Sequence, residues 1–206
     1  MAVKFGRFWE LGFKRTCLCY TKKLYLVLLR YWFGFDKWHA STPFECRPYK
    51  QEAVTVINEL EPNVVVEIGC GLGEIISRVE CERRIGIDRS GRVIRAARFL
   101  YGSSCVFMEG SIADHDSLVE AVGGHADVLV AINWPHSLPW SELYLSVRVI
   151  AGRLAARYLL IDGINPGVPG YAFHHGLGEF RELGEVRETV RSSDGIRTLY
   201  LIAIER

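Results

Sequence analysis

From Glu61 onward, short apolar segments rich in β-branched residues alternate with segments of helical periodicity. The predicted strands are 64–68, 84–88, 105–108, 127–132 and 158–161, and the predicted helices between them are 72–80, 93–100, 118–122 and 142–156. Two further strand-like segments, 185–190 and 197–205, flank the turn sequence Ser193-Asp194-Gly195. This order predicts an α/β fold whose sheet is mostly parallel and ends in an antiparallel hairpin.

In such sheets, ligands bind at the carboxyl ends of the strands, near the point where the strand order reverses. Functional side chains are therefore expected directly after each predicted strand. The connection 162–180 begins there, after the fifth strand, and is rich in Gly and Pro. A connection of this length in a compact domain is usually functional or mobile.

The segment after the first strand has the composition of a nucleotide-binding loop. Glu67-Ile68-Gly69-Cys70-Gly71-Leu72-Gly73 follows a buried strand and opens the predicted helix 72–80. Glycines allow the backbone to approach a ligand closely, and a helix N-terminus presents free N–H groups. Asp88 ends the second strand, where a carboxylate can accept both hydroxyls of a ribose.

The segments 65–73 and 85–88, together with the terminal hairpin, resemble the class I S-adenosylmethionine-dependent methyltransferase family over about residues 50–206. The resemblance implies a Rossmann-like, seven-stranded sheet and S-adenosyl-L-methionine as the cofactor. It implies that the methionine moiety contacts Glu67 and the loop residues Gly69, Cys70, Gly71 and Gly73, and that the ribose contacts Asp88. A dinucleotide-dependent dehydrogenase is the alternative, but its loop usually has the spacing G-x-G-x-x-G and lacks the preceding acid.

By the same resemblance, Ser111 and Ile112 after the third strand flank the adenine. Many relatives have Asp where this chain has Ser111, and a helix cap is the alternative role of that serine. The fourth strand is followed by Asn133-Trp134-Pro135-His136, which resembles the Asn-Pro-Pro-aromatic motif of amino-methylating relatives. Asn133 is therefore expected at both the cofactor and the acceptor.

The departures from that motif, Trp for the first Pro and His for the aromatic residue, favour a hydroxyl acceptor over an amine. A hydroxyl has a high pKa, so a nearby base assists its methylation, and His136 is the candidate base. Packing within the loop is its alternative role. Asp162 after the fifth strand and His174 in the long loop are candidates to orient the hydroxyl. His174 and His175 are otherwise expected to be solvated, and no acidic cluster predicts a metal site.

The segment from Trp38 to Lys50 precedes the first helix of the domain, and in the family such segments often cover the cofactor and the acceptor. Arg47, Tyr49 and Lys50 are candidates for binding a phosphate or the methionine carboxylate. A helix start with Pro48 in its first turn explains the same residues.

The net charge of +1 hides an asymmetry between two parts of the chain. Residues 1–40 carry eight basic and two acidic residues, a net charge of +6, so the remainder carries −5. We expect a basic, aromatic helical arm (1–40) beside a methyltransferase domain (41–206). Residues 1–35 combine a basic face with a Trp- and Leu-containing face, as interfacial membrane helices do; a helical cap on the domain and a nucleic-acid contact are the alternatives.

No run of 18 apolar residues predicts a transmembrane helix, and the six cysteines are expected to be reduced thiols. We therefore expect a cytoplasmic enzyme, at the inner face of a membrane if the arm binds one. The predicted activity is methyl transfer to a hydroxyl of a sugar, a glycan or a small molecule. The alternatives are N-methylation of RNA, protein or a small amine, and a non-catalytic protein that keeps the fold. Nucleic acid is not an expected partner, and the oligomeric state is not predicted.

Overall fold

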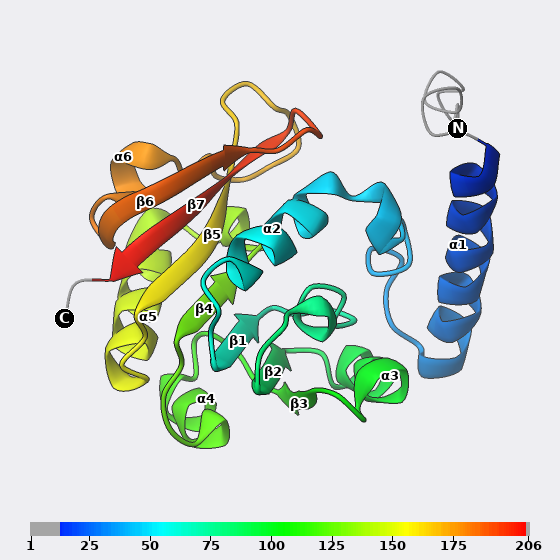
Figure 1. Cartoon of the computed structure of the whole chain (residues 1–206), viewed down its shortest axis with the longest axis horizontal. Helices are drawn as coiled ribbons and strands as arrows, with labels where there is room; N and C mark the ends of the chain where they lie inside the picture. The colour runs from blue at the N-terminus through cyan, green and yellow to red at the C-terminus, as the bar shows by residue number, and fades with distance from the viewer. Residues whose placement is uncertain (1–12, 205–206) are drawn as a thin grey trace.

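The computed structural model describes residues 13–204, with side chains described from Cys19 onward. One seven-stranded sheet forms its centre, in the order β3-β2-β1-β4-β5-β7-β6 (Figure 1). Strands β1 to β5 are parallel, and β7 is antiparallel to both β5 and β6. The predicted fold class is confirmed. The strands are β1 (Val64–Ile68), β2 (Arg83–Asp88), β3 (Val106–Glu109), β4 (Val128–Ala131), β5 (Tyr158–Ile164), β6 (Gly184–Arg191) and β7 (Arg197–Ile204).

Helices cover both faces of the sheet, and each face has its own apolar core. Side chains of α4 and α5 pack on one face, against Val66 and Leu129, whereas α2 packs on the other face, against Val65 and Val130. All residues of β1 and β4 are buried, which explains why these strands are apolar without alternation. The α-helices are α1 (Phe13–Phe33), α2 (Pro48–Asn58), α3 (Gly91–Tyr101), α4 (His115–Val122), α5 (Trp140–Arg153) and α6 (Leu177–Phe180).

The order of the strands determines where a ligand fits. Strand β1 lies between β2 and β4, so the chain passes from β1 to β2 and β3 on one side and then returns to β4 on the other side of β1. The carboxyl ends of β1 and β4 therefore border the crevice in which sheets of this kind bind ligands.

The helix predicted at 72–80 is wrong. Turns follow Gly71, and only a 3-10 helix at Ile76–Arg78 forms before β2. Gly73 has a φ of +78°, which an α-helix does not accommodate, and the Glu67 carboxylate accepts the N–H of Ile76 at 3.0 Å. The apolar residues of this segment are buried as the prediction required, but in a tight coil rather than a helix.

The region after the fourth strand also differs from the prediction. Asp162 lies inside β5 rather than at its end, because pairing with β7 continues to Ile164. The long connection contains the short helix α6. His175, which precedes α6 in this connection, is buried rather than solvated. The Ser193-Asp194-Gly195 turn is confirmed, with a φ of +72° at Gly195.

The prediction that all six cysteines are reduced is wrong for two of them. Cys19 in α1 and Cys46 form a disulfide, with their Cα atoms 6.9 Å apart. Cys70, Cys81 and Cys105 are free thiols, and the side chain of Cys17 lies outside the described residues. Sequence spacing offered no signal for this pair, because the two residues meet only when α1 lies beside the segment before α2.

Helix α1 stands at one side of the molecule, away from the sheet (Figure 1). Leu26 and Leu29 are buried in a small core shared with Val93 and Ala96 of α3. Within the described part of the chain, no helix is both long and apolar enough to cross a membrane. Residues 1–12 of the predicted arm lie outside the described residues.

Candidate functional site

The loop after β1 has the backbone conformation of a tight glycine turn. Gly69, Gly71 and Gly73 have φ values of +71°, +55° and +78°, a region that other residues rarely adopt. The N–H of Cys70 donates to the carbonyl of Ile87 at 2.9 Å, which fixes the loop against β2. The free thiol of Cys70 is buried behind the loop, and burial raises its pKa.

Glu67, directly before this loop, is only 4% exposed. Burial raises the pKa of Glu67 to about 8, and the nearby carboxylates of Glu74 and Asp88 act in the same direction, whereas Lys50 and the Ile76 N–H oppose it. Glu67 therefore carries a proton at pH 7 and is able to donate as well as accept a hydrogen bond.

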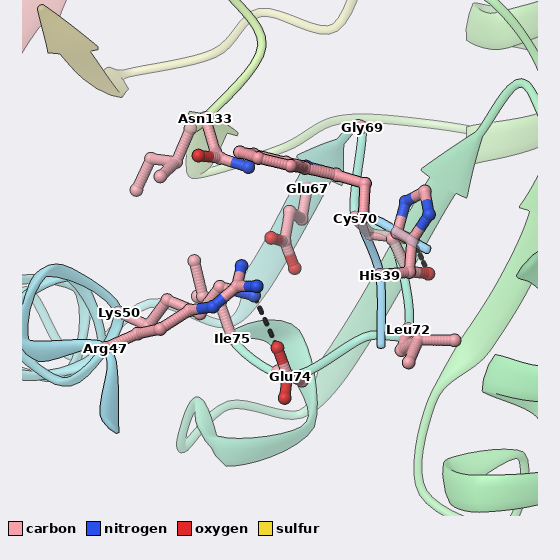
Figure 2. A pocket seen from close by; sticks show the side chains of 13 residues that line it. His39, Arg47, Lys50, Glu67, Gly69, Cys70, Leu72, Glu74, Ile75 and Asn133 are labelled. Carbon is pink, nitrogen blue, oxygen red and sulfur yellow. Dashed lines mark hydrogen bonds and ion pairs between the residues drawn. The ribbon is translucent and has the colours of Figure 1, made fainter. Parts of the chain in front are cut away.

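A small cavity of about 40 Å³ lies between the loop, the start of α2 and the end of β4 (Figure 2). Two cations, Arg47 and Lys50, lie on the α2 side, and Lys50 forms an ion pair with Glu74 at 2.5 Å. Asn133 closes the cavity on the β4 side. The lining residues are Trp38, His39, Arg47, Lys50, Glu67, Gly69, Cys70, Gly71, Leu72, Glu74, Ile75, Ile132 and Asn133.

Aromatic side chains cover the glycine loop. A methyl group at Gly69 would overlap the indole of Trp134, whose Nε1 donates to the Ile68 carbonyl at 2.5 Å. A methyl group at Gly71 would come within 3.0 Å of the His39 ring. The space that the glycines create is therefore filled by two side chains of the chain itself, and a nucleoside fits only when they move.

The segment that carries His39 is held by one exposed carboxylate. Asp36 accepts the N–H of Trp38 at 2.7 Å and that of His39 at 3.3 Å, and it pairs with the His39 imidazole at 3.0 Å. The expectation that the residues before α2 lie over the cofactor loop agrees with these contacts.

The predicted ribose and adenine residues do not line the cavity. Asp88 is 7% exposed, and its two oxygens accept the N–H groups of Gly71 and Ser90 at 3.0 and 2.9 Å. Ser111 and Ile112 are half-buried after β3. Ser111 accepts from the Ala113 N–H, and α4 is capped by Asp114, so the helix-cap interpretation of Ser111 is wrong.

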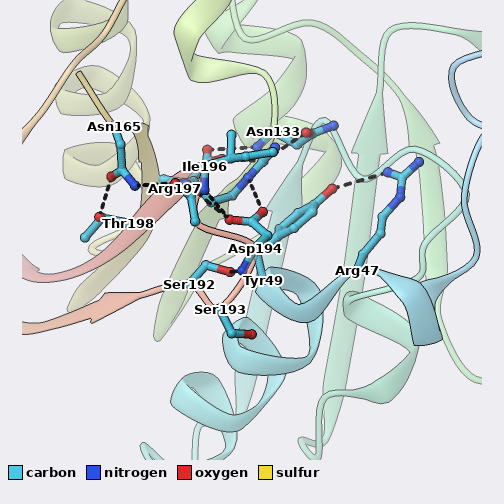
Figure 3. Close-up of polar contacts among 12 residues, drawn as sticks. Arg47, Tyr49, Asn133, Asn165, Ser192, Ser193, Asp194, Ile196, Arg197 and Thr198 are labelled. Carbon is cyan, nitrogen blue, oxygen red and sulfur yellow. Dashed lines mark hydrogen bonds and ion pairs between the residues drawn. The ribbon is translucent and has the colours of Figure 1, made fainter. Parts of the chain in front are cut away.

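The predicted acceptor side of the site is a polar cluster that joins β5, β7 and the loop after β4 (Figure 3). Asn133 follows β4 with a left-handed φ of +74°, and its N–H donates to Asp162 at 2.8 Å. Arg197, at the start of β7, donates from Nη1 to the side-chain oxygen Oδ1 of Asn133 at 3.0 Å and to the Asp162 carboxylate at 2.9 Å. Its guanidinium also lies 3.9 Å over the ring of Tyr49. Asp162 thus positions Asn133 and Arg197.

Sequence reasoning found Asn133 and Asp162 but missed Arg197. The only signal was the place of Arg197 directly after the hairpin turn, which gives no indication that its side chain turns inward. Arg197 is 4% exposed, and although burial opposes it, the Asp162 carboxylate keeps the pKa of Arg197 above its ordinary value.

The three histidines that follow β4 and β5 occupy different environments. His136 is half-buried with Tyr171 edge-on at 4.6 Å, and burial and the charge of Arg197 lower its pKa to about 4. His136, the candidate base, therefore does not have the near-neutral pKa of an ordinary histidine. His174 is exposed and bonds to the Val168 carbonyl, away from the cavity, whereas His175 is buried, stacks on Phe173 and bonds to the Leu138 carbonyl. Among the described residues, no group of three acidic, His or Cys side chains is arranged to hold a metal.

Comparison with known protein families and with curated protein sequences found no match. Solved structures do match. The chain superposes on magnesium protoporphyrin IX methyltransferase (ChlM) from Synechocystis PCC 6803 with bound SAH, with a TM-score of 0.62 and 17% identity over 77% of this chain and 84% of that one. N-methyltransferase NodS from Bradyrhizobium japonicum WM9, also with SAH, gives 0.62 and 16% over 78% and 89%. The methyltransferase domain of bacterial CtHen1 gives 0.62 and 15% over 77% and 98%.

Proposed function

We propose that this chain, which has the class I S-adenosylmethionine-dependent methyltransferase fold, transfers a methyl group from S-adenosylmethionine to a hydroxyl of a sugar, a glycan or a small molecule. The observation that carries the proposal is the loop Gly69–Gly73, with three left-handed glycines directly after the buried acid Glu67. It lies at the reversal of strand order and faces Asn133 across the cavity.

The residues present fit this cofactor. The glycine loop provides a backbone surface once His39 and Trp134 move aside, and protonated Glu67 provides a buried polar group beside it. Arg47 and Lys50 line the cavity and would hold the methionine carboxylate. Asp88 would hold the ribose after exchanging its present bond to Gly71. When bound, the cofactor supplies an electrophilic methyl group on a cationic sulfur.

The chain's own residues would align the acceptor and exclude water. Asn133 is held in place by Asp162 and Arg197, and Trp134, next to it in the chain, lies over Gly69. A positioned acceptor supplies most of the rate acceleration in a displacement of this kind. With a pKa of about 4, His136 is neutral at pH 7 and able to accept the hydroxyl proton, but only as a weak base.

Titration calorimetry of the purified chain with S-adenosylmethionine and with SAH tests the cofactor. We expect both to bind, and Gly71→Val to abolish binding, because Gly71 is left-handed and faces His39. Gly178→Val is the matched control, since Gly178 has open space around it. Absence of binding to the folded wild-type chain contradicts the proposal.

N-methylation is the second candidate activity, because Asn133 occupies the motif position of amino-methylating relatives and the fold matches that of N-methyltransferase NodS. Substitution of His136 separates the two activities. A base contribution predicts that His136→Ala lowers turnover roughly 10²-fold with cofactor binding intact. Unchanged turnover removes His136 from the mechanism. Cofactor binding without transfer to any acceptor would favour the third candidate, a non-catalytic protein.

We also propose that α1 lies on an anionic membrane surface. Leu24, Leu28, Tyr31 and Trp32 are 60–85% exposed and share the side of the helix opposite the buried Leu26 and Leu29. Lys23 in α1 and Lys37 shortly after it are exposed and suit anionic headgroups. The proposed location is therefore the cytoplasmic side of a membrane. The Cys19–Cys46 disulfide is at odds with a fully reducing compartment, and thiol counting on protein taken from cells tests that point.

Vesicle sedimentation tests the membrane contact. The full chain is expected to sediment with vesicles containing phosphatidylglycerol and far less with phosphatidylcholine alone. Leu28→Ser with Trp32→Ser should abolish sedimentation, whereas Leu145→Ser, at an exposed site on α5, should not. Equal behaviour of the two variants, or no sedimentation of the wild-type chain, contradicts a membrane role for α1.

A further inference from the structure

The orientation of the Asn133 side-chain amide is determined by its neighbour. The carbonyl oxygen accepts from Nη1 of Arg197 at 3.0 Å, and a guanidinium has only donors. The amide nitrogen therefore cannot face Arg197. Arg197 and Asp162 are buried and bonded to each other at 2.9 Å, and this ion pair opposes any movement of the arginine that would release the oxygen.

The amide nitrogen of Asn133 consequently faces the other way. Figure 2 shows it directed toward the side of the cavity on which Glu67 and Gly69 lie, with the oxygen turned away. Asn133 lines this cavity, and the hydrogen bonds that hold it among the described residues use its backbone N–H and its side-chain oxygen, which leaves the NH₂ group for a ligand. The site thus offers a donor, with two N–H groups, at the end of β4.

The cluster does not also repel amines through an excess of positive charge. Asp162 at 2.9 Å and Asp194 at 3.3 Å balance the positive charge of Arg197. Discrimination between acceptors therefore comes from the direction of the hydrogen bond. An oxygen nucleophile keeps a second lone pair that accepts from the Asn133 NH₂, whereas an amine presents N–H groups that need an acceptor.

We propose that Asn133, held by Arg197 with its NH₂ group toward the cavity, selects acceptors whose reacting atom is an oxygen and disfavours amines. This inference rests on the proposed methyl transfer. The acceptor oxygen forms a bond to the methyl carbon, the carbon–sulfur bond breaks with its electron pair left on sulfur, and the hydroxyl proton passes to His136 or to solvent. Asn133 contacts the acceptor, and Arg197 is a positioning residue.

Two cofactor analogues test the polarity without knowledge of the acceptor. Sinefungin carries an ammonium group where the transferred methyl group stands, and SAH has nothing there. In the wild-type chain, the ammonium group of sinefungin would face the Asn133 NH₂ group, and both groups are donors. We therefore expect sinefungin to bind at least about tenfold more weakly than SAH in calorimetry, which is the size of effect expected for an unpaired buried donor.

Variants separate hydrogen-bond polarity from other causes of weak binding. Asn133→Asp presents a carboxylate oxygen to the ammonium group, so the ratio of the two dissociation constants should shift about tenfold toward sinefungin. Asn165→Asp makes the same charge change outside the cavity, beside Gly195 and Thr198, and should leave the ratio unchanged. Arg197→Gln is the second variant, for use if Asn133→Asp does not fold. Glutamine offers an acceptor as well as donors, so the Asn133 amide is able to turn over, and sinefungin should then bind less weakly relative to SAH.

The outcomes are distinct. If the wild-type chain binds neither SAH nor sinefungin, both this inference and the proposed function fail. If it binds SAH and binds sinefungin equally or more tightly, the proposed function stands and the selection of oxygen acceptors is overturned. An unchanged ratio in both Asn133→Asp and Arg197→Gln also overturns it.

Discussion

The two sides of the candidate site are built in different ways. The cofactor side is one continuous segment, Glu67 to Gly73, whose backbone is stabilised by short contacts to β2. The acceptor side joins Asn133, Asp162 and Arg197 from the loop after β4, from β5 and from β7. The first side is covered by the rings of His39 and Trp134, which rotations of side chains alone would displace. The second side is held by the buried ion pair of Arg197 and Asp162.

This difference indicates which side adapts to a ligand. The rings of His39 and Trp134 lie against glycines, where their departure leaves a ready backbone surface. Departure of Arg197 would leave the buried Asp162 carboxylate unpaired, at a cost of several kcal/mol. We therefore expect the cofactor side to open and the acceptor side to stay fixed.

The largest effect is expected from breaking the acceptor side. Arg197→Met leaves Asp162 buried without its ion pair and should lower the free energy of unfolding in urea by about 3–5 kcal/mol. Arg187→Met removes an exposed ion pair with Glu185 and should cost less than about 1 kcal/mol. Similar losses in the two variants would mean that the acceptor side is no more rigid than the surface.

The next effect concerns the proton on Glu67. Its pKa rises from 4.5 to about 8 on folding, so the folded state binds more protons than the unfolded state between these values. Stability therefore falls as pH rises through this range, by at most about 1.4 kcal/mol per pH unit. Urea unfolding from pH 6.5 to 8, above the range in which the lowered pKa of His136 acts in the opposite direction, should show this decline in the wild-type chain and not in Glu67→Gln. Glu59→Gln, at an exposed site, should keep it, and an equal decline in all three contradicts the protonated Glu67.

A third prediction measures how tightly the cover packs on the loop. Gly69→Ala and Gly167→Ala both place alanine at a left-handed position, which costs about 1–2 kcal/mol. Only Gly69→Ala also pushes against Trp134, because Gly167 has open space around it. Gly69→Ala should therefore cost about 1–3 kcal/mol more in thermal or urea unfolding. Equal costs would show that the indole yields freely.

The smallest effect is expected from loosening the cover itself. Asp36→Ala removes the acceptor for Trp38 and His39 and should raise the affinity for S-adenosylmethionine about two- to fivefold, because less of the population is closed. Asp116→Ala, which removes an exposed ion pair with Arg153, should leave calorimetric affinity unchanged. Weaker binding by Asp36→Ala would mean that the segment holds the cofactor instead of covering its place.

Sequence patterns predicted the sheet and the cofactor loop because both depend on neighbours in the chain. Buried strands such as Val64–Ile68 are continuous apolar runs, and the glycines that need left-handed φ stand next to Glu67. The same reasoning failed at 72–80. There the apolar spacing fits a helix, but Gly73 and the bond from Ile76 to Glu67 impose a tight coil.

By itself, the sequence determined the fold class, the succession of strands along the chain and the place of the glycine loop, since local propensity and hydrophobic pattern encode these features. Tertiary structure alone decided three others: the proton on Glu67, the weak basicity of His136 and the direction of the Asn133 amide. The reason is that burial and hydrogen-bond partners come from residues distant in the chain. Arg197, which turns the Asn133 amide, lies 64 residues away from it.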